Sequence, residues 1–209
     1  APPTRSFLKK VTFFLMLTGL VIAVVGTAMQ QTISKGKFDF GNVQQFTGIL
    51  LKDPVPTFIG DDERTYYLVG TLKNGFPLNL AEKFHLRRVA LRGTLIEDEL
   101  EAMIEVVDHS VMGDDDTKAM PLPIADRGRV TLRGEIVDSK CHLGVMNPGR
   151  FKPHRACAIR CLSGGIPPVL VARTSQDHLA HYLLVGTDGS AINEAIIDYA
   201  AEPVEVSGT

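Results

Sequence analysis

Tryptophan is absent from this chain, and aromatic residues make up only 7% of its 209 positions. Neither sign of charge dominates, because 22 basic side chains stand against 24 acidic ones and the net charge is −2. A protein without a basic surplus has no overall attraction to a polyanion, and few aromatic rings leave no platform on which bases can stack. The composition therefore argues against a nucleic-acid-binding protein.

The sequence also lacks the short motifs that mark common catalytic and cofactor sites. It has no glycine-rich phosphate loop, no dinucleotide-binding glycine pattern, no paired-histidine zinc-protease motif and no serine nucleophile elbow. The segment from Glu97 to Asp116 holds nine carboxylates and no lysine or arginine, which is more typical of a solvated surface than of a glycosidase pair or a calcium loop. We therefore predict a protein that is not an enzyme and has no small-molecule substrate that its sequence identifies.

One long uncharged run, Val11–Met29, covers nineteen residues, close to the roughly 20 that cross a bilayer as a helix. A secretory signal peptide is the alternative interpretation, because Gly26, Thr27 and Ala28 offer small residues for cleavage. Since the sequence retains this run, we expect an uncleaved single-pass anchor within residues 1–31. Membrane lipid is then one expected partner.

Charge on the two sides of the run predicts its orientation. Three basic residues and no acid precede it, whereas two lysines on the far side are accompanied by Asp39. The positive-inside rule then places the N-terminus in the cytoplasm, the helix in a bacterial inner membrane and the bulk of the chain in the periplasm. The run offers no strong ligand for a haem or chlorophyll metal, but Gly19, Ala23 and Gly26 share one face against which a neighbouring helix can pack.

Beyond the anchor, residues 32–42 are polar and are expected to form a linker. From residue 43 onward, apolar residues alternate with polar ones, a pattern that predicts short β-strands bounded by turns. The expected elements are a helix at Leu80–Leu86 and strands at Phe46–Leu51, Thr65–Val69, Val89–Ile96 and Ala102–Val107. They define a first β domain over residues 43–112, a solvated linker over 113–126 and a second β domain over 127–209.

The second β domain resembles the first in sequence. Tyr66–Thr71 matches Tyr182–Thr187 at an offset of 116, and the Val89–Thr94 pattern returns at Val204–Thr209 at an offset of 115. Arg133–Ile136 matches the earlier segment 47–50 at an offset of only 86, so the second copy carries an insertion over residues 139–168. The fold class we expect is mainly β, with one N-terminal transmembrane helix followed by two tandem small OB-like β-barrel or sandwich units and a cysteine-containing loop–helix insertion in the second. Because the chain as given ends in an expected strand, we also expect the native chain to continue.

The insertion contains all three cysteines, in the spacing C-x15-C-x3-C. If Pro153 opens a helix, His154, Cys157 and Cys161 share one of its faces, and the glycines at 164 and 165 end it. Local geometry alone then gathers the groups that can carry chemistry. His178 and His181 lie in an expected loop before a strand, and we expect both at the surface unless the fold brings them near the cysteines.

Three interpretations of this cluster remain open. A disulfide from Cys141 to Cys157 or Cys161 is preferred in an oxidising periplasm, because i, i+4 positions on one helix hold their Cβ atoms too far apart for a bond between the last two. A metal site from Cys141, His154, Cys157 and Cys161 has ligands suited to zinc, or to a soft metal such as copper. A catalytic thiol is the third, but the sequence shows no base to pair with it.

The residues around the cysteines carry a resemblance to a known group of proteins. Gly134–His142 fits the pattern G-x-[VI]-V-D-x-x-C-[YH], and His154–Cys161 fits the motif H-x-x-C-A-x-x-C. The chain thereby resembles a little-characterised group of bacterial extracytoplasmic OB-like proteins that accompany membrane electron-transfer complexes. The resemblance covers Val130–Val171 and implies a β domain in an energy-transducing membrane, with no defined reaction.

These observations predict a non-catalytic accessory subunit of a large bacterial membrane complex, either photosynthetic or respiratory. Its single helix would anchor and stabilise the complex by packing against integral membrane subunits, and its β domains would cover the periplasmic face. The alternative is a membrane-tethered periplasmic metal-binding or thiol-redox protein that uses the cysteine and histidine cluster.

Overall fold

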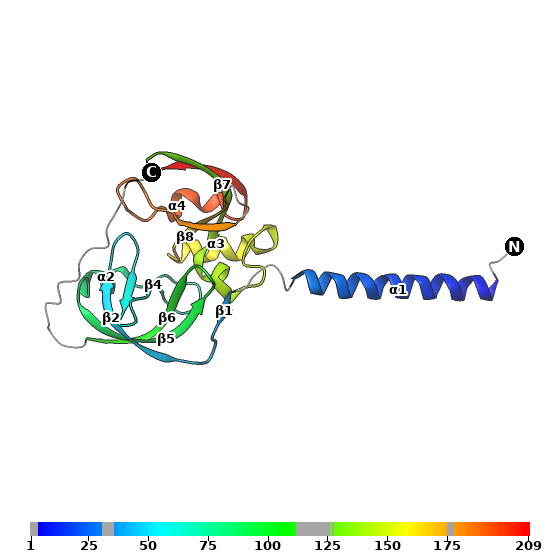
Figure 1. Ribbon diagram of the computed structural model, residues 1–209, viewed down its shortest axis with the longest axis horizontal. Coiled ribbons are helices and arrows are strands. Elements are labelled where there is room, and N and C mark those ends of the chain that lie inside the picture. Colours follow the sequence, from blue (N-terminus) through cyan, green and yellow to red (C-terminus); the bar gives the residue numbers. More distant parts are fainter. Residues whose placement is uncertain (1–3, 31–35, 112–125, 127, 175–177) are drawn as a thin grey trace. The chain divides into compact units, whose positions relative to one another are not determined.

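The computed structural model describes residues 4–30, 36–111, 126, 128–174 and 178–209 (Figure 1). It divides the chain into two compact units, residues 1–34 and residues 35–209, and each is considered by itself below. The expected linker over 113–126 lies outside the described residues except for Asp126.

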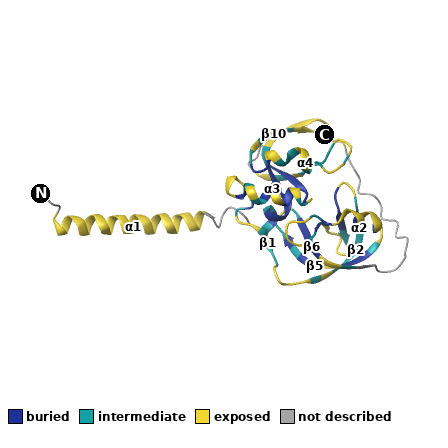
Figure 2. Cartoon of the chain, turned by 180° about the vertical axis from the view of Figure 1, so that it is seen from behind, coloured by how far each residue is buried: buried dark blue, intermediate teal, exposed yellow. Residues whose placement is uncertain are grey.

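The N-terminal unit is the helix α1, Arg5–Gln30. Figure 2 shows it exposed along its whole length, although its side chains are mostly apolar. Its stretch Arg5–Met29 has a mean hydropathy of 2.3 and is long and apolar enough to cross a membrane. The predicted apolar helix is therefore present, and it begins earlier than the uncharged run because the basic leader continues the same helix.

The second unit begins with a sheet that closes on itself. Its strands are β1 (Lys37–Phe38), β2 (Gln44–Leu51), β3 (Thr57–Gly60), β4 (Thr65–Val69), β5 (Arg88–Glu97) and β6 (Ala102–Val111). They pair in the order β1-β5-β2-β3-β4-β6, and β5 also pairs with β6, so five strands form a closed circuit. All pairings are antiparallel except β4 with β6, and α2 (Leu78–Lys83) connects β4 to β5. Strand β1 lies in the segment that was expected to be a linker. It is a strand there because it pairs with the end of β5.

The barrel closes around side chains that alternate along its strands. Leu50, Phe58 and Leu68 are fully buried and belong to one apolar cluster. Strand β5 pairs on both sides and shifts register by one residue between Arg92 and Gly93. A Cβ at position 93 would collide with β6, so glycine there lets the long strand bend and close the barrel.

A second, four-stranded sheet follows, built from β7 (Val130–Asp138), β8 (Pro168–Arg173), β9 (Leu179–Leu183) and β10 (Pro203–Gly208). Its order β10-β7-β8-β9 repeats the order β5-β2-β3-β4 of the first sheet. The connection from β9 to β10 contains the short helix α4 (Asn193–Ile196) and the turn η3 (Ile197–Tyr199). The expected sequence matches thus fall on strands that occupy equivalent places in the two sheets.

The turns after β4 and β9 are equivalent as well. Val69 forms an isolated bridge with Gly75, and Val185 forms the same bridge with Ala191, 116 residues later in both cases. The Gly70 and Gly186 amides each donate to the carbonyl four residues ahead. The molecule is mainly β with a barrel-like sheet, as expected from the sequence.

The cysteine insertion separates β7 from β8. It consists of the turn η1 (Cys141–Val145), the 3-10 turn η2 (Lys152–His154) and the helix α3 (Arg155–Ser163). Pro153 lies in η2 and leads into α3, and Gly165 ends the helix with a φ of +87°, a conformation that favours glycine. The predicted helix is confirmed. Residues 35–209 form one unit because η1 packs against β1 and β5 of the barrel.

Candidate functional site

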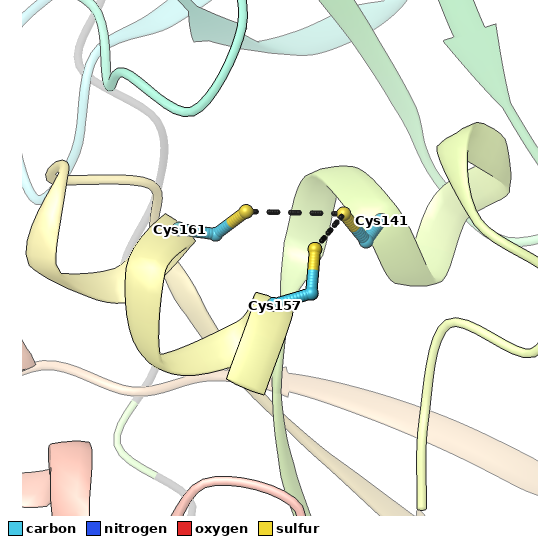
Figure 3. A group of neighbouring side chains, drawn as sticks. All are labelled: Cys141, Cys157 and Cys161. Atoms are coloured by element: carbon cyan, nitrogen blue, oxygen red, sulfur yellow. Dashed lines mark hydrogen bonds between the residues drawn. The ribbon is translucent and has the colours of Figure 1, made fainter. Parts of the chain in front are cut away.

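Three thiols converge where η1 meets α3 (Figure 3). Cys141 is the first residue of η1, and Cys157 and Cys161 lie one turn apart on α3. The Cys141 Sγ is 3.8 Å from the Cys157 Sγ and 3.8 Å from the Cys161 Sγ, and all three sulfurs lie within 4.8 Å of one another. Cys141 is therefore the common vertex of the group, which we call the thiol triangle.

The thiol triangle lies in an apolar environment. Cys141 and Cys161 are 3% and 1% exposed, and they pack with Val69, Ile96 and Met103 of the barrel. Cys157 is only partly buried. A reagent or ligand from solvent therefore reaches the triangle first at Cys157.

A lysine from the barrel faces the thiol triangle. Lys73, in the turn after β4, places its Nζ 2.7 Å from the Cys157 Sγ and 3.7 Å from the Cys161 Sγ. Its hydrogen bond to Cys157 raises the pKa of Lys73, and its charge favours anionic sulfur. Sequence reasoning missed this residue, because nothing in a lone loop lysine indicates a contact 84 residues away.

A buried lysine holds that turn in place. Lys140, which precedes Cys141, is 1% exposed and forms an ion pair with Glu105 of β6. Its Nζ also donates to the carbonyls of Gly70 at 2.9 Å and Leu72 at 2.6 Å. Leu72 has a φ of +59°, which is unfavourable for leucine, so the bond to its carbonyl helps to maintain the turn that presents Lys73.

A histidine–carboxylate pair adjoins the other side of Cys141. Asp138, at the end of β7, accepts the Cys141 amide at its Oδ1 (2.9 Å) and contacts the His154 Nε2 with its Oδ2 (2.7 Å). Both side chains are completely buried, and the His154 Nδ1 has no hydrogen-bond partner. The ionised carboxylate only accepts, so the Nε2 carries the proton and the Nδ1 of a neutral ring keeps a free lone pair.

The four residues expected to bind a metal are divided between two overlapping groups of possible ligands, and the second group also includes Asp138. One is the thiol triangle, and the other joins Asp138, Cys141 and His154, whose ligand atoms also lie within 4.8 Å of one another. His154 orients toward Asp138 and Cys141 rather than completing the triangle. Asp138 was not expected in the site, although its position three residues before Cys141 is a sequence signal for a side chain that binds the Cys141 amide.

The thiols share their protons unequally. The hydrogen bond between Cys141 and Cys161 lowers the pKa of Cys161, and the same bond together with burial and the Asp138 charge raises the pKa of Cys141. Of the two buried sulfurs, Cys161 therefore ionises more readily. Cys141 stays protonated until another cation displaces its proton.

The structure treats the two predicted disulfides alike. Cys141, Cys157 and Cys161 are free, and the 3.8 Å separations from Cys141 to the other two are the same. A disulfide needs an S–S distance of about 2.05 Å, so either bond requires a comparable inward movement. The disulfide between Cys141 and Cys157 or Cys161 stays a prediction.

The expectation that His178 and His181 both lie at the surface is half wrong. His178 is exposed, but the His181 side chain on β9 is only 3% exposed. Its Nε2 lies 3.1 Å from the Nε2 of His142, the residue after Cys141, and its Nδ1 lies 3.2 Å from a Glu101 oxygen. The turn between β5 and β6 brings Glu101 there, a placement that the β9 sequence does not reveal. Burial lowers the pKa of His142 to about 4, with the His181 charge as the next cause, so His142 is neutral at neutral pH.

The sulfur separations are compatible with a bound metal ion as well as with hydrogen-bonded thiols. In a tetrahedral site with Zn–S bonds of ~2.3 Å, neighbouring sulfurs are about 3.8 Å apart. Both separations from Cys141 have this value. The Cys/His/Asp cluster can therefore hold a metal.

No protein-family model matches the chain, and neither a curated protein nor a solved structure resembles it significantly.

Proposed function

We propose that this protein is a membrane-anchored binder of a thiophilic metal ion, with Cys141, Cys157 and Cys161 as the ligands. The single observation that carries the proposal is the pair of 3.8 Å separations from Cys141, which equal the edge of a zinc–thiolate tetrahedron. The arrangement brings together soft ligands from η1 and α3, although fifteen residues separate Cys141 from Cys157 in the sequence.

Charge favours a divalent ion over a monovalent one. A divalent ion and the Lys73 ammonium together balance three thiolates, whereas a monovalent copper ion leaves one negative charge in an apolar site. Zinc is the ion we propose first, and copper(I) is the variant. With three thiolates as ligands, a fourth position faces Lys73 and stays open to water or to a group from a donor or acceptor of the metal.

His154 and Asp138 support the site from its buried side. In zinc sites a carboxylate usually accepts from a histidine that itself binds the ion, whereas here the histidine lies beside the proposed ligands. Here Asp138 fixes both His154 and the backbone amide of Cys141. We propose that this pair sets the position of the Cys141 sulfur and takes up the proton that Cys141 loses when metal binds.

The barrel supplies the rest of the scaffold. We infer that it is an OB-type barrel and that the second sheet is a partial copy of it, since the two strand orders, the turns after β4 and β9 and the sequence matches coincide. We also propose that α1 crosses a bacterial inner membrane with its N-terminus in the cytoplasm, so that the thiol triangle works in the periplasm.

The test is metal analysis combined with thiol counting on the full chain, purified in mild detergent under oxygen-free conditions without added reductant. We expect about one zinc or copper ion per chain and three thiols that become reactive only after a chelator removes the metal. Lys73→Met keeps all three ligands and should weaken zinc binding by about tenfold, because one uncompensated charge remains. A metal-free protein with one reactive thiol would show a structural disulfide and overturn the proposal.

A second candidate follows from the helix α1. Its exposed apolar surface includes Gly19 and Gly26, at both of which a neighbouring helix would meet open space. This observation favours an accessory subunit that packs against integral subunits of a photosynthetic or respiratory complex, as expected from the sequence. Mass spectrometry of native material from bacterial membranes should then find pigment-binding or cytochrome subunits in stoichiometric amounts. A chain that migrates alone contradicts this role and leaves the metal site untouched.

A further inference from the structure

His142 and His181 form a second, partly buried cluster of metal-binding side chains, on η1 and β9. Their Nε2 atoms are 3.1 Å apart, their ring centroids are 4.8 Å apart and their planes are inclined by 72°. In a linear N–H···N bond both ring radii would add to the nitrogen separation and place the centroids farther apart. The observed geometry instead fits two rings whose Nε2 atoms point toward one common position beside them, rather than directly at each other.

That geometry matches two imidazoles on one ion. With metal–nitrogen bonds of 2.0–2.1 Å, nitrogens 3.1 Å apart subtend an angle of about 100° at the metal. This angle lies between those of tetragonal and tetrahedral coordination, both of which imidazole ligands support.

The surroundings of the pair have the features of a metal environment. Glu101 lies 3.2 Å from the His181 Nδ1 and Asp98 lies 4.0 Å from the same atom, so a carboxylate fixes the proton on the Nδ1 and leaves the Nε2 lone pair free. The Tyr67 hydroxyl lies 3.4 Å from the other Glu101 oxygen.

We propose that His142 and His181 bind a divalent transition-metal ion at a second site, separate from the thiol triangle. The ion would take its remaining ligands from water, with Glu101 and Asp98 as outer carboxylates. Because η1, β9 and the β5–β6 turn meet here, the ion would also connect the barrel with the second sheet. This site does not depend on the thiol triangle, although Cys141 and His142 are consecutive in the chain.

Zinc titration of the reduced full chain in detergent tests the proposal. We expect two ions per chain for the wild type and one for His181→Gln, which should retain the ion on the thiol triangle. His178→Gln is the matched control, since His178 is exposed and lies only three residues earlier, and it should keep both ions. A wild-type chain that binds one ion, unchanged in His181→Gln, would show that the two rings are joined by a hydrogen bond only.

A second measurement covers the case in which His181→Gln fails to fold. The variant with all three cysteines replaced by alanine removes the thiol triangle and should still bind one Cu²⁺ ion, with electron paramagnetic resonance coupling from two imidazole nitrogens. Absence of nitrogen coupling in a folded chain would overturn the proposal. If nitrogen coupling appears but the wild type holds no metal on its thiols, the function proposed for the thiol triangle is wrong and the histidine site stands.

Discussion

Cys141→Ala is expected to lower the zinc affinity of the thiol triangle by more than about 100-fold. Loss of an outer partner of a metal ligand alone costs roughly 10–100-fold, and this change removes a ligand. Cys141 is also the one thiol that lies 3.8 Å from both others, so its loss leaves Cys157 and Cys161 on one helix without a third sulfur. Competition with a chelator of known affinity measures the effect.

Ser139→Ala is the matched control for this experiment. Ser139 is buried two residues before Cys141, and its hydroxyl has no hydrogen-bond partner. Its removal should leave both the metal affinity and the unfolding midpoint nearly unchanged, because no bond is lost. If Cys141→Ala folds and binds zinc as tightly as the Ser139→Ala control does, the thiol triangle is not the metal site.

Glu105→Gln is expected to destabilise the folded chain by about 3–5 kcal/mol, because it leaves the buried Lys140 ammonium without its counter-charge. The side chains of Lys140 and Glu105 are only 2% and 14% exposed, so water cannot replace the lost partner. The two backbone carbonyls that accept from Lys140 are dipoles and compensate for the charge only in part. Denaturant unfolding in detergent measures the change in the free energy of unfolding.

The exposed pair of Lys52 and Glu82 provides the comparison. Its nitrogen and oxygen are 2.7 Å apart, but the Glu82 side chain is 68% exposed. Glu82→Gln should therefore cost less than about 1 kcal/mol. Equal effects of the two substitutions would show that the Lys140–Glu105 pair contributes no more than a surface contact. Glu105→Gln should also weaken zinc binding, since the Lys140 bonds maintain the turn that carries Lys73.

The apolar helix and most of the barrel strands were predictable from the sequence, because each sequence pattern acts over a few residues. The uncharged run predicts α1 by length and hydropathy, and alternation predicts β2, β4, β5 and β6 close to their observed bounds. The short strand β3 was not expected, since Thr57–Gly60 follows a proline-rich turn and is only four residues long. Its pairing with β2 and β4 decides its conformation.

The sequence by itself determined the thiol pair on α3. Pro153 and the two glycines limit the helix, and its period places Cys157 and Cys161 on one side. It also made Cys141 the expected third member, as a disulfide partner or a metal ligand. These conclusions need only local geometry and a count of the cysteines.

Only the tertiary structure decided what surrounds those thiols. Lys73 reaches Cys157 across 84 residues and Lys140 reaches the Gly70 carbonyl across 70, while His142 and His181 meet across 39. The two lysine contacts exist because η1 and α3 pack on the barrel, and the histidine contact exists because η1 meets β9. No local pattern encodes which loop a packed surface will face. The sequence specified the three cysteines, and the packing of the barrel against the insertion supplied the charged and supporting groups around them.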